Sequence, residues 1–375
     1  MSRSAVIAAY ARTPFQPANR GPFARTRPDD LLAAAIRAIV ERSRIDPERI
    51  EDLLVGCAFP EAEQGLNVAR LAGLLAGLPQ GVAAATVNRF CGSSMQAVHM
   101  AAGAIALGAG DAFICAGVES MTRVPIPGFN PMPHPKLAKD MPAAYIGMGE
   151  TAENVASRYG IDRGRQEAFA VESHARAAQA AGGGKLAEEV VAIGDVGSDG
   201  CIRPGTDAAA LAALEPAFMK SGTVTAGTSS PLTDGAAAVL VTSEDFASAN
   251  GLRAMARIRS VAVAGCAPEI MGMGPVAASR KALERAGVSM SDIDIVEINE
   301  AFASQALACM DELGIDPARA NIDGGAIALG HPLGATGARI TGKAVSLLVR
   351  EGGKLALATQ CIGGGQGIAT VLEAI

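Results

Sequence analysis

Two cysteines and a histidine occupy glycine-rich settings in which thiol chemistry is feasible. Cys91 lies in the stretch Val-Asn-Arg-Phe-Cys-Gly-Ser-Ser at 87–94, directly before apolar residues at helical spacing. We therefore expect it at a helix start, where unpaired N–H groups and the helix dipole favour a thiolate. A small buried cysteine without chemistry would give the same local pattern.

His331 follows Gly-Gly-Ala-Ile-Ala-Leu-Gly at 324–330 and precedes Pro-Leu-Gly. The glycines allow tight turns, and a cysteine and a histidine far apart in sequence can form a nucleophile–base pair. The other histidines are weaker candidates. We expect His99 in a helix core, and His134 and His174 on the surface of a loop-rich region.

Cys361 ends a strand-like run and opens Cys-Ile-Gly-Gly-Gly-Gln-Gly at 361–367. A thiol beside glycine N–H groups could act as acid or base next to an oxyanion, although a plain tight turn would also fit. A dinucleotide loop does not fit, because another strand-like run follows instead of a helix. Asn299 ends a further strand, where its amide could hold a water or cap the next helix.

Short apolar runs alternate with amphipathic stretches, as at 5–9, 30–42 and 50–56. This alternation predicts βαβ units in an α/β protein with a largely parallel sheet. The region from about 120 to 216 is rich in Pro and Gly and predicts an inserted, loop-rich domain. We expect helices in it at 151–159 and 166–180.

A helix followed by a strand and glycine occurs at 91–119 and again at 337–363. The repeated order favours two related halves. A length of 375 residues is sufficient for two such domains.

Composition narrows the class of protein. The chain is 49% hydrophobic with a net charge of -6, and it has no Lys/Arg run of the kind nucleic-acid binders use. No uninterrupted apolar stretch reaches the roughly 18 residues of a membrane span. Strand-like sequence begins almost at once, so we expect no targeting peptide. The seven cysteines form no CxxC pair, which favours reduced thiols in the cytoplasm and no metal site.

The motifs also occur together and in order: the stretch around Cys91, Asn-Glu-Ala-Phe at 299–302, Gly-Gly-Ala-Ile-Ala-Leu-Gly-His-Pro at 324–332, and the glycine motif at 361–367. In this the chain resembles the thiolase family over essentially its whole length. The resemblance implies an α/β thiolase fold with five layers, αβαβα. Its expected parts are an N-terminal half at 1–119 and 233–252, a loop domain covering CoA at 120–232, and a C-terminal half at 253–375.

The resemblance also implies roles for the reactive side chains. His331 would take the proton of Cys91, whose thiolate attacks the 3-keto carbon of a 3-ketoacyl-CoA. Cys361 would protonate the acetyl-CoA enolate, and CoA would then accept the acyl group from Cys91. His331 and a water held by Asn299 would stabilise one oxyanion, and the N–H groups of Cys91 and Gly363 the other.

Coenzyme A is expected as a co-substrate, with no permanently bound cofactor. By the same resemblance Ser230 lies near the pantetheine, and the channel is lined by Met148, Ala226, Met271 and Phe302.

Differences at individual positions between thiolase subfamilies indicate the substrate class. Biosynthetic acetoacetyl-CoA thiolases usually have His where this chain has Gly147, while 264–272 and Ser229-Ser230 look like bacterial fatty-acid β-oxidation enzymes. A degradative 3-ketoacyl-CoA thiolase is therefore favoured, with a biosynthetic acetoacetyl-CoA thiolase as the alternative. The resemblance suggests a homodimer or homotetramer, and a hydratase–dehydrogenase subunit is a candidate partner.

Other classes fit less well. Ketoacyl synthases combine Cys with two histidines, but here Asn299 and Cys361 stand in the motifs. Sterol-carrier-type thiolases have His-Asp-Cys-Phe where this chain has Asn-Glu-Ala-Phe. A nicotinamide-dependent oxidoreductase needs glycines after its first strand, and residues 10–15 contain none. A non-catalytic scaffold would need none of these motifs.

Overall fold

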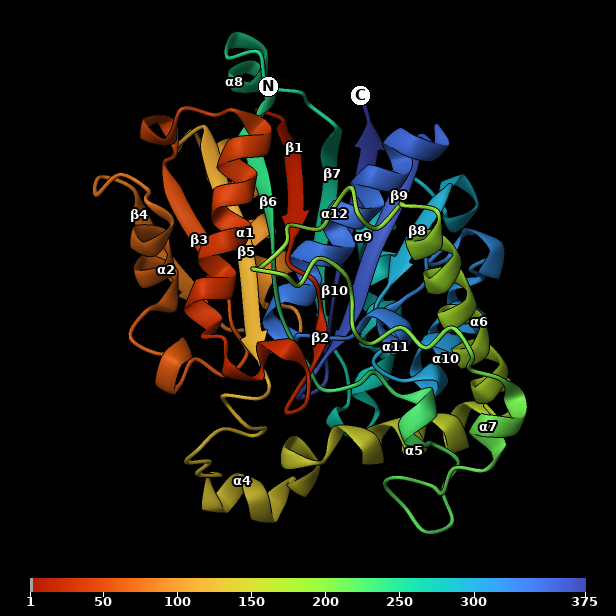
Figure 1. Ribbon diagram of the computed structural model, residues 1–375. Coiled ribbons are helices and arrows are strands. Elements are labelled where there is room, and N and C mark those ends of the chain that lie inside the picture. Colours follow the sequence, from red (N-terminus) through yellow and green to blue (C-terminus); the bar gives the residue numbers. More distant parts are fainter. Residues whose placement is uncertain (1–2) are drawn as a thin grey trace.

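Ten strands form one continuous sheet in the computed structural model, which describes residues 3–375 (Figure 1). The order is β4-β3-β5-β6-β1-β7-β10-β9-β8, and the short β2 pairs with β6. The strands are β1 (Ala5–Arg12), β2 (Gln16–Pro17), β3 (Asp52–Gly56), β4 (Ala83–Val87), β5 (Ala112–Ser120), β6 (Thr233–Ser243), β7 (Ala256–Gly265), β8 (Ile295–Ile298), β9 (Leu355–Ile362) and β10 (Gln366–Ala374).

The expectation of a largely parallel sheet is wrong, because the sheet is mixed. β3 is parallel to β4 and β5, and β8 is parallel to β9, whereas the other pairs are antiparallel. The connection from β9 to β10 is only the turn at 363–365, and so short a connection permits only an antiparallel pair. β6 also returns antiparallel to β5 after the long insertion.

The two halves repeat one strand arrangement. β3-β5-β6-β1 in the N-terminal half corresponds to β8-β9-β10-β7 in the C-terminal half. An isolated parallel bridge between Val296 and Ala320 lies beside β8, in the place that β4 holds beside β3. The halves join through β1 and β7, with Val6 opposite Arg257 and Ile7 opposite Ala256.

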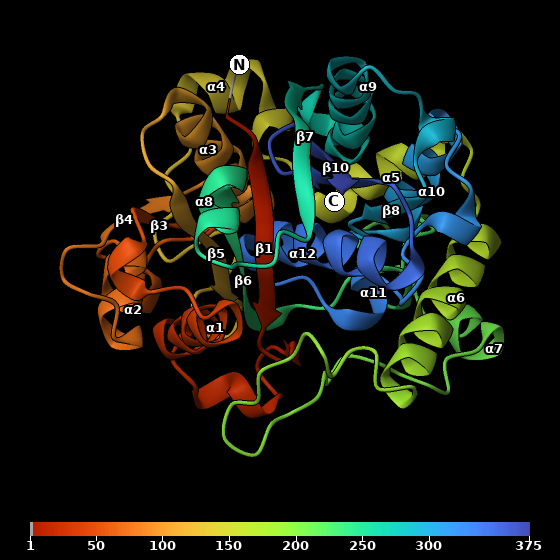
Figure 2. The same cartoon turned by 90° about the horizontal axis from the view of Figure 1, so that it is seen from above.

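Helices form three layers around the two halves of the sheet (Figures 1 and 2). α1 (Pro28–Ser43) and α2 (Val68–Ala76) cover the N-terminal half, and α9 (Gly274–Ala286) packs on the outer face of the C-terminal half, with α10 (Ala303–Leu313) beside it. α3 (Ser93–Leu107) and α12 (Leu333–Glu351) lie between the halves, and α12 contacts strands of both. This is the expected αβαβα layering.

The central helices approach closely because of glycine. A Cβ on Gly337 of α12 would lie 2.3 Å from the backbone nitrogen of Met95 on α3. One on Gly342 would lie 2.2 Å from the ring of Tyr10 on β1. Larger residues at either position would push α12 out of the space between the halves.

The segment between β5 and β6 is built from helices and irregular chain. It contains α4 (Pro135–Asp140), α5 (Met148–Tyr159), α6 (Arg163–Gly182) and α7 (Ala208–Ala212), so both helices expected here are present. The remaining helices are α8 (Glu244–Ala249) and α11 (Ala326–Leu329), and 3-10 turns occur at Pro22–Arg25, Pro47–Arg49, Ala62–Gln64, Pro142–Tyr145, Ala226–Thr228, Pro268–Met273, Met290–Asp292 and Pro317–Arg319. The division into 1–119 with 233–252, 120–232 and 253–375 stays a prediction.

His174 departs from expectation, because it is buried on α6 rather than exposed. Its Nδ1 accepts the backbone N–H of Arg203 at 3.2 Å, since the chain after α6 folds back over it. His134 is exposed and caps α4, and His99 is buried in α3, as expected. In the described part of the chain, no helix is long and apolar enough to cross a membrane.

Candidate active site

Cys91 lies in a strained turn between β4 and α3. Phe90 has a φ of 43°, in the left-handed region that a bulky residue rarely adopts. The side chain of Asn88 accepts the Phe90 N–H at 2.8 Å, and the Ser93 hydroxyl donates to the Phe90 carbonyl at 2.6 Å. These bonds hold the turn and place Cys91 two residues before the helix, as the sequence predicts.

The Cys91 thiol is neutral at rest. Burial raises its pKa to about 11, although hydrogen bonds from the N–H groups of Gly363 and of Cys91 itself act in the opposite direction. The same two N–H groups are the predicted oxyanion donors, and both lie close enough to the sulfur to lower the pKa of the thiol. A thiol of this kind needs a base to become a nucleophile.

His331 lies between α11 and α12 and is buried. Its Nδ1 is 2.6 Å from the Thr336 hydroxyl, which itself donates to the Pro332 carbonyl at 3.1 Å. Thr336 must therefore accept the Nδ1 proton, which leaves Nε2 unprotonated and facing Asn299 Nδ2 at 3.4 Å. Burial and then Arg339 lower the pKa of His331 to about 3, so the imidazole is a neutral proton acceptor.

Two buried carboxylates, which sequence reasoning left without a role, hold the loop that carries His331. Glu119 accepts the Gly334 N–H at 2.9 Å and the Ala58 N–H at 2.8 Å, tying α12 to the N-terminal half. Glu300 accepts the Ile327 N–H at 3.1 Å and the Ser173 hydroxyl at 2.7 Å, tying the loop to α6.

Cys361 lies near the end of β9 and is buried. Burial and then the neighbouring Cys91 raise the pKa of its thiol well above the usual value, so the two thiols share one environment. Asn299 follows β8, and its N–H donates to the Thr359 carbonyl on β9 at 3.0 Å. The alternative in which Asn299 caps the next helix is wrong, because Phe302 holds that position at α10.

The turn after Cys361 requires glycine. Gly364 and Gly365 have φ values of 79° and 84°, and a Cβ on Gly365 would lie 2.4 Å from the Cys266 carbonyl. Just before the turn, the buried Gln360 donates its amide hydrogen to the Cys91 carbonyl. Gln360 is a contact that sequence reasoning missed, and it joins the strand carrying one thiol to the turn carrying the other.

The predicted CoA-channel residues fall into two groups. Met271, Phe302 and Cys361 belong to one buried cluster, with Met148 packed against it. Ser230 is half-buried and adjoins the cluster, because its N–H donates to the Ala301 carbonyl at 3.0 Å.

Ala226 is exposed at the start of a 3-10 turn, so it lies at the rim. The half-exposed ring of Phe218 meets the Phe302 ring edge-on at 5.8 Å, and it was not foreseen. An irregular loop with no periodicity offers no signal for such a contact.

The arrangement suits covalent acyl transfer. A neutral thiol, a neutral imidazole with an unprotonated Nε2, a second thiol and two neighbouring N–H groups are the parts such chemistry uses. All seven cysteines are free, and the described residues contain no cluster of His, Cys, Asp and Glu that could hold a metal ion.

Comparison with known proteins agrees with this geometry. Residues 5–245 match the model of the thiolase N-terminal domain, and 252–374 match that of the thiolase C-terminal domain. The chain is 46% identical over 388 residues to a 3-ketoacyl-CoA thiolase of Bacillus subtilis (strain 168), and 49% identical over 385 residues to one of Shewanella loihica, with 99% of each chain covered in both comparisons.

A solved structure gives the same result for the fold. The crystal structure of human mitochondrial 3-ketoacyl-CoA thiolase superposes with a TM-score of 0.92 at 36% identity, covering 99% of both chains. Both domain models, in order and over nearly the full length, show that the chain belongs to the thiolase family.

Proposed function

We propose that this protein is a 3-ketoacyl-CoA thiolase, an acyltransferase that cleaves 3-ketoacyl-CoA with CoA. One observation carries the assignment of the site: Gln360, next to Cys361 on β9, donates its amide hydrogen to the Cys91 carbonyl, so the two thiols and the Gly363 N–H lie together. Nucleophile, oxyanion donor and second thiol thus converge on a single point. The relatives named above carry the same activity in their names.

In the first half-reaction, Cys91 gives its proton to Nε2 of His331 and attacks C3 of the substrate. The C2–C3 bond then breaks, leaving the shortened acyl group on Cys91 and the enolate of acetyl-CoA. Cys361 donates its proton to C2, and acetyl-CoA leaves. The raised pKa of Cys361 suits it to hold a proton until a carbanion forms.

In the second half-reaction, CoA gives its thiol proton to the Cys361 thiolate and attacks the acyl group. Cys91 departs as a thiolate and recovers its proton from the His331 imidazolium. Both residues thus return to their starting states. The neutral resting forms of Cys91 and His331 favour proton transfer in step with C–S bond formation rather than a standing ion pair.

Two oxyanions need donors during this cycle. The N–H groups of Cys91 and Gly363 serve the oxygen on C3, since both lie near the reacting sulfur. Asn299 and His331 serve the enolate oxygen, with a water held by the Asn299 side chain. Loss of one such donor typically slows the reaction by roughly 10² to 10³.

The CoA and acyl parts of the substrate lie along Ser230, Ala226, Met148, Met271 and Phe302. The last three pack with Cys361 and give the channel an apolar wall. At Gly147, before α5, a Cβ would meet only the Glu150 side chain. Gly147 stands where biosynthetic enzymes usually have His, which supports degradation of longer 3-ketoacyl-CoAs over the biosynthetic acetoacetyl-CoA alternative.

We also propose a homodimer or homotetramer, located in the cytoplasm and acting in fatty-acid β-oxidation. β4 lies at one end of the sheet, and its residues are half-buried or exposed, so a second copy has an edge to cover. A hydratase–dehydrogenase subunit is a candidate partner. Sedimentation showing an active monomer would exclude the oligomer.

The deciding experiment is thiolysis of 3-ketoacyl-CoAs of increasing chain length, with mass spectrometry of the peptide that contains Cys91. Turnover that rises with chain length, with the acyl mass on Cys91, supports the proposal. Activity on acetoacetyl-CoA alone favours the biosynthetic alternative, and no acyl adduct with any substrate excludes both.

A further inference from the structure

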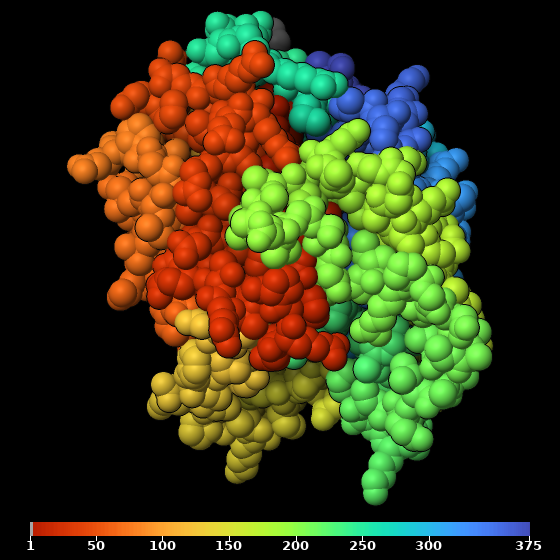
Figure 3. All heavy atoms as spheres, viewed as in Figure 1, coloured from red at the N-terminus to blue at the C-terminus, as the bar shows by residue number. Residues whose placement is uncertain are grey.

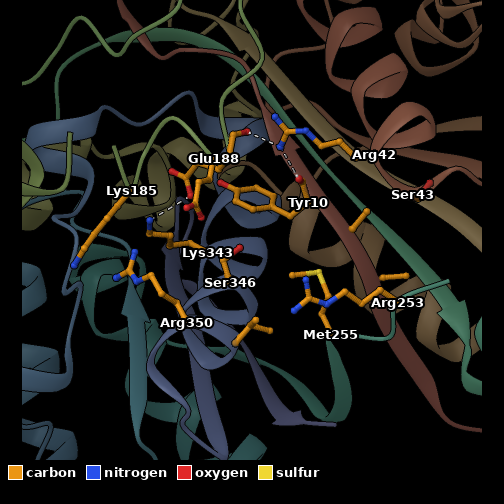
Figure 4. Close-up of a pocket in the computed structure, with 14 residues that line it drawn as sticks. Tyr10, Arg42, Ser43, Lys185, Glu188, Arg253, Met255, Lys343, Ser346 and Arg350 are labelled. Atoms are coloured by element: carbon orange, nitrogen blue, oxygen red, sulfur yellow. Dashed lines mark hydrogen bonds and ion pairs between the residues drawn. The ribbon is translucent and has the colours of Figure 1, made fainter. Parts of the chain in front are cut away.

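A cavity of about 430 Å³ lies between β1, the C-terminal part of α12 and residues 185–189 (Figure 4). We propose that it binds a small organic anion, a phosphate or carboxylate compound with a partly apolar body. The cavity is separate from the candidate active site. His331 precedes α12, whereas Lys343 and Arg350 near the far end of the helix line the cavity. At 1.5 Å per residue, Lys343 lies roughly 15 Å along the helix from its first residue, Leu333.

Residues from five segments line the cavity: β1, the end of α1, 185–189, 253–255 and α12. On the face shown in Figure 3, the N-terminal chain in red and the chain near residue 190 in green lie next to each other, with C-terminal residues in blue beyond them. The cavity thus lies where both halves meet the inserted segment.

Three cations lining the cavity have no carboxylate partner among the described residues. The Arg42 guanidinium donates only to main-chain carbonyls, those of Tyr10 at 3.0 Å, Glu189 at 3.2 Å and Val190 at 2.9 Å. Lys185 and Arg253 are exposed and make no side-chain hydrogen bond or ion pair within residues 3–375.

The other charges of the cavity are largely neutralised. Lys343 pairs with Glu189 at 3.2 Å and with Asp323 at 2.6 Å, and Arg350 also pairs with Asp323 at 2.6 Å. Glu188 is then the lining carboxylate that lacks a partner in the described chain. Three uncompensated cations against one carboxylate make a positive recess on a protein whose net charge is -6.

A neutral donor adds to the charged groups. The Tyr10 hydroxyl is buried and has no hydrogen-bond partner in the described part of the chain. Figure 4 shows its ring extending from β1 toward Glu188. A buried hydroxyl without a partner is costly, and an anionic oxygen would satisfy it. Ala8, Ala9, Met255 and Val349 supply apolar lining for the body of the ligand.

Isothermal titration calorimetry at low ionic strength tests the proposal on the full-length protein, with ADP, pyrophosphate and citrate as probes. ADP and pyrophosphate report phosphate recognition, and citrate reports carboxylate recognition. We expect at least one probe to bind. The double variant Lys185→Gln and Arg253→Gln should weaken that binding at least tenfold, and Tyr10→Phe several-fold.

The matched control is Arg44→Gln with Lys354→Gln, which removes the same charge from exposed residues outside the cavity lining. The cavity variants should catalyse thiolysis at the rate of the parent protein. This measurement verifies that the variants are folded, and it shows that a loss of probe binding is independent of the proposed activity. Three outcomes would each overturn the proposal. The first is that no probe binds, and the second is that the control variant weakens binding as much as the cavity variants do. The third is that CoA displaces the probe while the cavity variants leave its binding unchanged.

Discussion

Thr336 accepts the Nδ1 proton of His331 across 2.6 Å while donating its own proton to the Pro332 carbonyl. The imidazole therefore has one tautomer, with the lone pair of Nε2 directed toward Asn299. In the proposed reaction Thr336 would act through His331, as a positioning residue.

Thr336→Val should lower kcat roughly a hundredfold with little change in KM, because a freely turning imidazole loses most of its general-base effect. Thr336→Ser keeps the hydroxyl and should retain most of the activity. Steady-state thiolysis with a pH profile measures both variants. Equal losses of kcat in the two variants would show that any change of side-chain shape at this position lowers activity. The hydrogen bond of the Thr336 hydroxyl to His331 would then not be the reason for the loss.

Cys91→Ala should abolish both cleavage and formation of the acyl enzyme. Cys361→Ala should impair carbon–carbon cleavage more than acylation of Cys91 by a preformed acyl-CoA, because only cleavage generates a carbanion that Cys361 must protonate. Intact-mass measurement after incubation with acyl-CoA separates the two steps. Equal loss of acylation in both variants would contradict this division of roles.

Gln360→Met removes the donor to the Cys91 carbonyl while keeping side-chain volume. We expect the rate of Cys91 alkylation by iodoacetamide, and kcat, to fall about tenfold, since the strained Phe90 turn loses a restraint that costs roughly 1.4 kcal/mol to remove. Gln360→Glu keeps the shape but removes the hydrogen-bond donor, so it should behave like Met when ionised. Unchanged alkylation in both variants would mean that Asn88 and Ser93 suffice to hold the turn.

His99 offers a test of pH-dependent stability away from the thiols. It is buried in α3 against Thr370, and burial, followed by Arg89 and Arg285, lowers its pKa to about 3. Between that value and the unfolded pKa near 6.5, the unfolded chain binds a proton that the folded chain refuses, so His99 destabilises the fold as pH falls.

His99→Gln removes this effect. Relative to the variant, the parent protein should lose about 1.4 kcal/mol of unfolding free energy for each pH unit below 6.5. Urea unfolding at pH 7, 6 and 5 measures the difference. Parallel curves for the two proteins would show that His99 takes up its proton in the folded state.

The sequence was most informative where signals are local. Helical periodicity located α5 and α6, and strand-like runs placed Asn299 and Cys361 at strand ends. Contacts between distant segments were not accessible in this way: Glu119 meets Gly334 across 215 residues, and no local pattern encodes that pairing. The same holds for the burial of His174 by chain that follows α6, and for the direction of β6. The catalytic roles of Cys91, His331, Cys361, Asn299 and Gly363, and the CoA contacts, stay predictions.

The position of α12 limits the independence of the two halves. By sequence it belongs to the C-terminal half, yet it also packs on β1, β5 and β6. A fragment ending near residue 252 would lack this helix, and only α3 would remain to cover those strands on that face. The duplicated halves are thus coupled: each contributes side chains to a hydrophobic core that both share, so removal of one half would expose apolar surface of the other.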